Sequence, residues 1–175
     1  HILGAAELLQ ARGDNVSAED RKEWLNNIVT AAQRLQRWVE RAEVLVALLS
    51  GRVDLEFQEV DLRPLVEGIA AGLAVDFNQR VVAINLYLPE PALATCDPTH
   101  VETAISSVIH HALHRTVDER QVNVRLDASG DHWNLRVEDG GPTVTTEHLP
   151  NLFEPFADPD EVLHNRGDGL GLAIA

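Results

Sequence analysis

Residues able to form an anion or nucleotide site lie near the end of this 175-residue chain, in the stretch Gly167-Asp168-Gly169-Leu170-Gly171-Leu172-Ala173-Ile174. Three glycines at alternate positions allow positive φ angles or a close backbone approach to another group. The apolar residues after them are typical of the start of a helix, whose unpaired N–H groups attract anions. No Gly-Lys-Ser/Thr follows, which excludes a P-loop. A plain loop before a helix would carry the same residues, so this stretch alone assigns no function.

A second glycine turn lies upstream, in Val137-Glu138-Asp139-Gly140-Gly141-Pro142 at the end of an expected strand. A carboxylate there can accept a hydrogen bond from the exocyclic amino group of a purine, and the glycines allow the base to lie against the backbone. An aromatic pair, Phe153 and Phe156, follows in Leu152-Phe153-Glu154-Pro155-Phe156 on an expected short helix end. Asp139 is also a common turn residue, and the phenylalanines are equally consistent with core packing.

Composition narrows the class of protein. The net charge of −14, from 28 acidic and 14 basic residues, argues against nucleic-acid binding, which needs clustered Lys and Arg. No run of 18 apolar residues occurs, so we expect no membrane contact within this fragment and a cytoplasmic location. Cys96 is the only cysteine, which fits a reducing compartment and excludes a thiolate zinc site. The chain does not begin with Met, so we expect it to be an excised piece, such as the cytoplasmic part of a membrane-bound sensor.

Residues 1–50 have the pattern of two helices. Residues 1–12 are good helix formers, and Gly13-Asp14-Asn15 is typical of a turn. Ser17 and Asp20 approximate a capping box for a second helix that closes at Ser50-Gly51. Spacings of three and four place an apolar seam along it, formed by Leu25, Ile28, Ala32, Leu35, Val39, Ala42, Val46 and Leu49. Because a two-helix hairpin has too little core to stand alone, we predict antiparallel helices that form a four-helix bundle in a homodimer.

Residues 51–175 alternate strand and helix patterns, which predicts a second domain and an α+β fold. Apolar–polar alternation predicts strands over residues 53–62, 80–88, 121–126 and 132–137, the last two joined as a hairpin by residues 128–131. Asp61 and Asp97 are expected to cap helices that carry Pro64 and Pro98 in their first turns and run to about residues 75 and 116. We predict a two-layer α/β sandwich with the sheet covered on one face.

The order of these motifs resembles the catalytic and ATP-binding domain of sensor histidine kinases, in the superfamily that also holds gyrase B, Hsp90 and MutL. The matching order is an Asp-glycine box, a Phe box, a polar stretch over residues 157–166 as a lid, and a second glycine box. The N-terminal half is similar to the dimerisation and histidine-phosphotransfer helices of that family. The run from Leu55 to Arg63 looks like the usual start of its kinase domain. The resemblance covers essentially the whole chain.

The resemblance implies roles for particular residues. Asp139 would bind adenine, and Gly141 would shape the base pocket. Phe153 and Phe156 would anchor the lid. The remaining nucleotide-binding residues would belong to the second glycine box, facing the triphosphate: Gly167, Gly169, Leu170 and Gly171. The implied cofactors are ATP and Mg²⁺.

The chain departs from the family in the N box, whose pattern is Asn-x-x-x-Asn-Ala-x-Lys-aromatic-Ser/Thr. In the matching stretch, residues 107–116, the two Asn positions hold Ser107 and His111, and the Lys position holds His114. The i, i+4 spacing keeps both replaced positions on one helix face. His111 would stand at the Mg²⁺ position, but an imidazole nitrogen suits this hard ion poorly. In the first glycine box, Thr143 replaces the family's second Gly.

Other histidines leave alternatives open. His110 and His114 have helical spacing for a zinc site, but surface or groove histidines are the favoured interpretation. His1 could be the phosphoacceptor, although residues 1–9 look more like the segment that follows the family's acceptor box. In that case the acceptor precedes this chain.

Two functional hypotheses follow. The first is an ATP-dependent protein-histidine kinase with weakened catalysis, which passes its phosphoryl group to the receiver domain of a response regulator. The alternative is a pseudokinase that regulates another histidine kinase or a response regulator by binding through its helical bundle. A gyrase-like or Hsp90-like ATPase is disfavoured because those proteins lack the preceding heptad hairpin.

Overall fold

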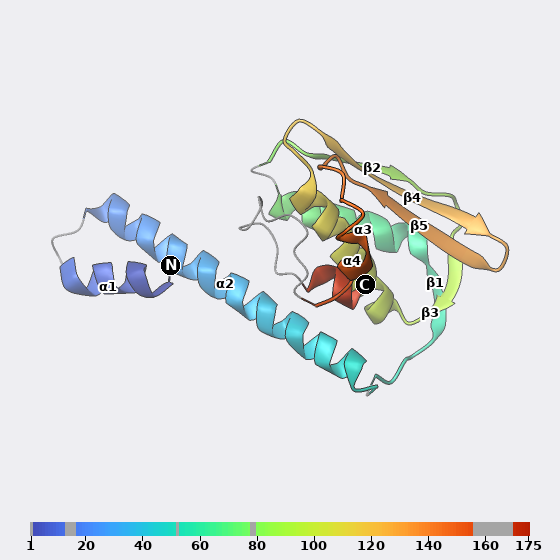
Figure 1. Cartoon of the computed structure of the whole chain (residues 1–175), viewed down its shortest axis with the longest axis horizontal. Helices are drawn as coiled ribbons and strands as arrows, with labels where there is room; N and C mark the ends of the chain where they lie inside the picture. Colours follow the sequence, from blue (N-terminus) through green and yellow to red (C-terminus); the bar gives the residue numbers. More distant parts are fainter. Residues whose placement is uncertain (1, 13–16, 52, 78–79, 156–169) are drawn as a thin grey trace. The chain divides into compact units, whose positions relative to one another are not determined.

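The structure, a computed structural model, describes residues 2–12, 17–51, 53–77, 80–155 and 170–175. The chain divides into two compact units, residues 1–46 and 47–175 (Figure 1). Within the described ranges, no helix is both long enough and apolar enough to cross a membrane.

The first unit is helical. Helix α1 spans Ile2–Arg12, and the longer helix α2 spans Ala18–Leu49. Ser17 caps α2: its hydroxyl accepts a hydrogen bond from the Asp20 backbone N–H at 3.0 Å and donates one to the Asp20 carboxylate at 2.7 Å. Beyond the helix, Gly51 has φ +63° and its N–H donates to the Leu48 carbonyl oxygen at 3.1 Å. The predicted cap and glycine stop of the second helix are therefore confirmed.

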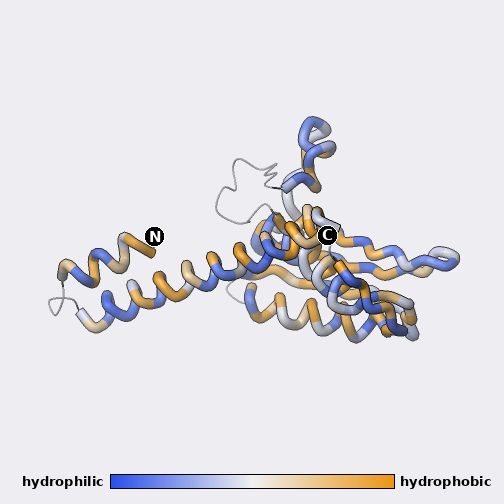
Figure 2. The backbone as a smooth tube through the Cα atoms, turned by 90° about the horizontal axis from the view of Figure 1, so that it is seen from below, coloured by the Kyte–Doolittle hydropathy of each residue, from blue (hydrophilic) through white to orange (hydrophobic). Residues whose placement is uncertain are grey.

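The apolar seam of α2 is open to solvent in the single chain. Figure 2 shows apolar residues recurring along this helix among polar ones. The large side chains exposed on α2 are Leu25, Val29, Leu35, Trp38, Val39, Val46, Leu48 and Leu49. Exposed apolar surface of this extent marks an interaction site.

The second unit contains a three-stranded sheet in the order β2-β4-β5. Strand β2 (Ala83–Tyr87) pairs in parallel with β4 (Gln121–Ser129), which pairs antiparallel with β5 (His132–Glu138). Gly130 has φ +64° in the hairpin turn, a conformation that favours glycine. The predicted hairpin is confirmed, with strands slightly longer than expected, whereas the strand predicted over residues 80–88 is shorter.

Helices α3 (Leu62–Asp76) and α4 (Pro98–Arg115) begin at the predicted aspartate caps. The Asp61 carboxylate accepts a hydrogen bond from Arg63 N–H at 3.1 Å. The Asp97 carboxylate accepts from the N–H groups of Thr99 and His100 at 3.0 and 3.1 Å. Both caps satisfy N–H groups that have no partner within the helix.

The core lies between these helices and one face of the sheet, as Figure 1 shows. Val122, Val124 and Leu126 of β4 are buried, while the intervening Asn123 and Arg125 face away from the core. The buried residues that pack together are Val66, Ile69, Leu73, Ile105, Ile109, Ala112, Leu113, Val122 and Val124. This confirms the α+β sandwich with a sheet covered on one face, because the period-2 pattern of β4 places its apolar side chains on a single side.

A second, two-stranded sheet corrects two expectations. Strand β1 covers only Gln58–Asp61, not residues 53–62, because Asp61 caps α3 and Leu62 is already helical. Its antiparallel partner, β3 (Leu93–Cys96), was not predicted. This four-residue strand lies between the cis Glu90–Pro91 bond and the cap of α4, so its apolar pattern is too short to recognise without its partner.

The last described elements are short. A 3₁₀ helix, η2, covers Leu149–Asn151, and Phe153 follows it in a turn, not on the helix end expected for residues 152–156. Helix α5 (Gly171–Ile174) contacts α4, and the Leu170 side chain before it is only 2% exposed. The predicted helix after the second glycine box is confirmed over these four residues.

Candidate functional site

The candidate site forms where the C-terminal end of α4 meets the glycine turn after β5. Thr116, which follows α4, is fully buried. Its hydroxyl donates to the Ala112 carbonyl oxygen at 2.7 Å and accepts from the Gly140 N–H at 3.1 Å. The final residue of the N-box stretch therefore holds the first glycine box directly.

Arg115 makes a second connection to the same turn. Its side chain is 6% exposed, and its Nε lies 3.4 Å from the Asp139 carboxylate. A terminal nitrogen of the guanidinium also donates to the Pro142 carbonyl oxygen. A buried guanidinium needs such partners, because an unpaired charge is costly to remove from water.

The backbone of the turn approaches α4 too closely for a side chain at Gly141. A Cβ atom placed there would lie 2.5 Å from the Arg115 carbonyl oxygen and 2.8 Å from the Asp139 carboxylate. The Gly141 N–H donates to that same carboxylate at 2.7 Å. This close approach is the steric reason for a glycine at position 141, while its expected role in shaping a base pocket stays a prediction. The Asp139 carboxylate is an acceptor of the kind that can pair with the amino group of adenine.

The N-box positions lie further back along α4. Ser107 is 4% exposed, and His111, one turn later, is half-buried. Because α5, which begins at Gly171, contacts the same helix, α4 adjoins both the first glycine box and the last glycine of the second. The spacing of four residues places Ser107 and His111 on one helix face.

This donor set does not fit Mg²⁺. The ion prefers oxygen ligands, whereas Ser107 offers one hydroxyl and His111 an imidazole nitrogen. Within the described part of the chain, no group of three His, Cys, Asp or Glu side chains is placed to hold a metal ion.

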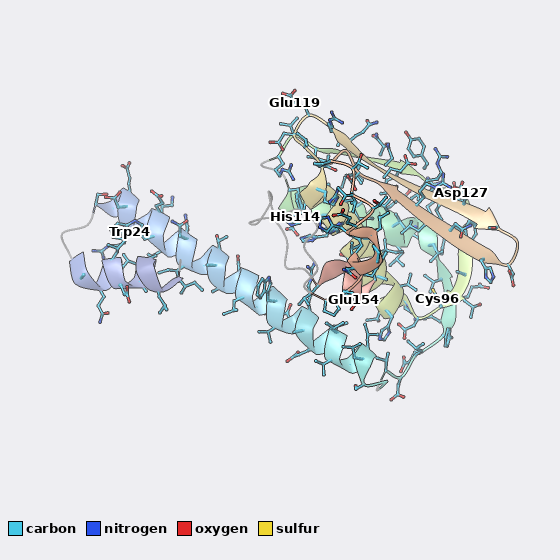
Figure 3. All side chains as sticks on the ribbon, in the orientation of Figure 1. Trp24, Cys96, His114, Glu119, Asp127 and Glu154 are labelled. Atoms are coloured by element: carbon cyan, nitrogen blue, oxygen red, sulfur yellow. The ribbon has the colours of Figure 1, made fainter. Side chains whose placement is uncertain are left out.

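The neighbouring histidines form an aromatic cluster. The Nε2 atoms of His110 and His114 are 3.2 Å apart, and Phe77, the residue that follows α3, packs edge-on against both rings. Figure 3 labels His114 on α4 below the sheet. Among the described residues no third His, Cys, Asp or Glu is grouped with His110 and His114, and the interpretation as surface or groove histidines stays a prediction.

The structure describes some of the other predicted site residues and not others. Phe153 is 62% exposed, and Thr143 is exposed as well. Phe156, Gly167, Gly169 and the possible acceptor His1 lie outside the described residues, so their proposed roles stay predictions. The ion pair of Arg115 was not anticipated, although Arg115 at the aromatic position of the N-box pattern was a visible signal.

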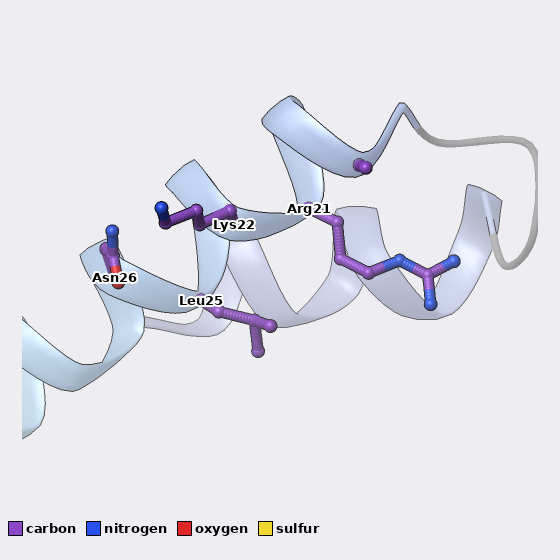
Figure 4. Close-up of a pocket in the computed structure, with 5 residues that line it drawn as sticks. Arg21, Lys22, Leu25 and Asn26 are labelled. Atoms are coloured by element: carbon purple, nitrogen blue, oxygen red, sulfur yellow. The ribbon is translucent and has the colours of Figure 1, made fainter.

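A pocket in the helical unit is a separate feature. It is lined by five residues from the first turns of α2, drawn in Figure 4: Ala18, Arg21, Lys22, Leu25 and Asn26. Its lining contains neither a carboxylate nor a glycine turn, which are the groups that make the Asp139 turn a candidate nucleotide site.

Comparison with known proteins gives the class. Residues 96–175 match the family described as histidine kinase-, DNA gyrase B-, and HSP90-like ATPase. Over 173 residues the chain is 24% identical to the sensor protein CreC of Escherichia coli, covering 99% of this chain and 35% of CreC. The chain therefore spans about a third of the length of this curated relative.

Solved structures agree on the fold. The histidine kinase AdeS of Acinetobacter baumannii superposes with a TM-score of 0.69 at 22% identity, over 97% of this chain and 80% of that one. The histidine kinase ThkA, solved in complex with the response regulator protein TrrA, gives a TM-score of 0.69 at 15% identity, over 97% of this chain and 51% of that one. Residues 96–175 therefore carry a domain of the histidine kinase-, DNA gyrase B-, and HSP90-like ATPase family, and the chain as a whole is similar to sensor histidine kinases.

Proposed function

We propose that this chain is the kinase module of a two-component sensor, which binds an adenine nucleotide and transfers its γ-phosphoryl group to a histidine with weakened efficiency. One observation carries the proposal: the Asp139 turn is fastened to α4, the helix on which Ser107 and His111 replace the two amide residues of the N box. Relative to the family pattern, the chain keeps the residues expected to bind the base, Asp139 and Gly141, and lacks the two Asn residues expected at the metal.

On the base side, Asp139 would accept a hydrogen bond from the exocyclic amino group of adenine. The Oδ1 atom of Asp139 already accepts a hydrogen bond from Gly141 N–H. Because each carboxylate oxygen has two lone-pair directions, Oδ1 can accept a second hydrogen bond from the base. A Cβ atom at Gly140 would meet the Arg120 side chain and one at Gly141 the Arg115 carbonyl oxygen, so the two glycines allow the turn that presents Asp139 to pack against the end of α4. The glycines at 167, 169 and 171, with Leu170, would face the phosphates, and Phe153 and Phe156 would anchor the lid.

On the phosphate side, phosphoryl transfer depends on positioning and on neutralising the charge of the triphosphate. In magnesium-dependent kinases the metal supplies much of that neutralisation. Since the donor set of Ser107 and His111 does not fit Mg²⁺, we expect this chain to bind nucleotide without much help from the ion and to turn over slowly.

The proposed function also assigns the two domains and their protein partners. Residues 1–50 would form the dimerisation and histidine-phosphotransfer hairpin and residues 51–175 the catalytic domain, working as a cytoplasmic homodimer. The exposed apolar seam of α2 supports this dimer. A response-regulator receiver domain would accept the phosphoryl group, since the similar kinase ThkA was solved with such a protein.

A second candidate is a pseudokinase that acts by binding another histidine kinase or a response regulator. The Ser107 and His111 replacements favour it, because both N-box amides are absent. Transfer of radiolabel from ATP to a supplied acceptor hairpin separates the two: slow labelling supports the kinase, and none supports the pseudokinase.

The first test is calorimetric titration of ATP and ADP with and without Mg²⁺. We expect the dissociation constants with and without the ion to agree within about threefold, a difference of about 0.7 kcal/mol. Submicromolar binding that requires Mg²⁺ would contradict the proposed loss of the metal side.

The double variant Ser107→Asn with His111→Asn should then gain magnesium dependence, because it restores two amide oxygens to one helix face. Ser106→Asn with His110→Asn is a matched control, since it makes the same exchanges one residue earlier on α4. An equal gain in the control pair would show that position on the helix is irrelevant. Asp139→Asn should weaken nucleotide binding in either background.

A further inference from the structure

We propose that Arg115 is a positioning residue that fixes the Asp139 carboxylate and thereby sets the preference for adenine over other purine bases. The inference rests on the proposed nucleotide site. It starts from a cation that the family pattern does not contain: the N box has an aromatic residue where this chain has Arg115. The guanidinium is 6% exposed and faces the turn that carries Asp139.

The contacts hold the turn at both ends. Gly140 N–H donates to the Thr116 hydroxyl at 3.1 Å, and the Pro142 carbonyl oxygen accepts from the Arg115 guanidinium. The backbone between these points is therefore tied to the end of α4. What remains to be fixed is the rotation of the Asp139 side chain.

Two donors fix that rotation. Gly141 N–H donates to Oδ1 of Asp139 at 2.7 Å, while Nε of Arg115 lies 3.4 Å from Oδ2. Each oxygen is held by one donor on a different side, so the plane of the carboxylate is set. Since a carboxylate offers about four lone-pair sites, both oxygens keep capacity for a further hydrogen bond.

A fixed acceptor discriminates between bases. Adenine presents an amino group at its 6-position, which donates to a carboxylate, whereas hypoxanthine presents a carbonyl oxygen there, which the carboxylate repels. A site built to pair with an N–H rejects an analogue that lacks it, because its polar group is then left unpaired. A carboxylate free to rotate could turn away from the carbonyl and would reject hypoxanthine less well.

A purely structural role for Arg115 predicts something else. A cation at a helix C-terminus stabilises the helix, and a partly buried ion pair supports local packing. Losing only those effects would lower stability, and would weaken all nucleotides by the same factor. The ratio of the dissociation constants of ITP and ATP separates the two roles.

The experiment measures that ratio by calorimetry for the full 175-residue chain. Arg115→Met keeps the length of the side chain but removes the charge and the donors, and we expect it to lower the ITP/ATP ratio about tenfold. Arg120→Met is the matched control: Arg120 is exposed beside Gly140 and should leave the ratio unchanged. An unchanged ratio in Arg115→Met would overturn the inference.

Further variants keep the test decisive. If Arg115→Met does not fold, Arg115→Lys decides: a lysine cannot reproduce the planar fork that reaches both Asp139 and Pro142, so the ratio should fall, and a wild-type ratio would overturn the inference. In Asp139→Asn, adding Arg115→Met should change the ratio no further. Should Asp139→Asn bind ATP as tightly as the wild type, the nucleotide site itself is misassigned. Should Asp139→Asn lose discrimination while Arg115→Met keeps it, only the role of Arg115 fails.

Discussion

Single side chains at the end of α4 (Pro98–Arg115) determine where the glycine turn lies. The Thr116 hydroxyl uses both of its hydrogen-bonding functions, donating to Ala112 and accepting from Gly140. Arg115, one residue earlier, reaches the other end of the turn at Pro142. These two adjacent residues thus connect the end of α4 to both Gly140 and Pro142 of the turn.

Thr116→Val should therefore lower the free energy of unfolding by about 1 kcal/mol, because the partly buried N–H of Gly140 loses its acceptor while the side-chain volume is conserved. Urea unfolding measures this directly. Thr116→Ser keeps the hydroxyl and loses only a methyl group, so it should be less destabilising. Equal stability of Thr116→Val and the wild type would show that Gly140 finds another partner.

At the scale of elements, the cap of α4 also holds the segment before β1. The Asp97 side chain, 8% exposed, accepts from the backbone N–H of Glu56 at 2.8 Å as well as from Thr99 and His100. The Glu56 hydrogen bond, followed by that of His100, lowers the pKa of Asp97 to about 2. These bonds favour the charged carboxylate, so the folded protein holds it ionised.

This shift has a definite sign for stability against pH. Because the folded pKa lies below the ordinary value of about 3.9, the contribution of Asp97 is complete above that value and is lost as the pH falls toward 2. We expect the wild type to be more stable than Asp97→Asn at pH 7, with the difference shrinking between about pH 4 and pH 2. Chemical unfolding at a series of pH values checks this, and a constant difference would contradict it.

At the scale of the whole molecule, the apolar seam of α2 (Ala18–Leu49) is exposed in the single chain and needs a partner surface to be buried. Leu35 and Val39 are 56% and 52% exposed, although their spacing belongs to a buried heptad position. A second copy of the same helix pair would cover them and give the four-helix bundle that we propose.

Val39→Glu should therefore convert the proposed dimer to a monomer, because it would bury a charge in the seam. Analytical ultracentrifugation gives the oligomeric state. Gln33→Glu, which adds the same charge on the polar face of α2, should leave the dimer intact. A wild-type chain that stays monomeric at high concentration would rule out the bundle.

The sequence by itself determined the local features and the order of motifs. Ser17, Asp61 and Asp97 could be identified as caps, because a cap and the N–H groups it serves are at most three residues apart. The hairpin and the alternation of β4 are also local, and the sequence of boxes identified the family. The roles of the second glycine box and the Phe box rest on that resemblance alone.

Only the tertiary structure decided the non-local pairings. Strand β3 exists because residues 93–96 meet β1, more than 30 residues earlier. Arg115 pairs with Asp139 because α4 ends against the turn after β5, and residues 24 positions apart leave no periodic trace in a sequence. The motifs identify the candidate residues of the site. The contact between the Asp139 carboxylate and the Arg115 guanidinium, however, depends on the packing of α4 against the sheet.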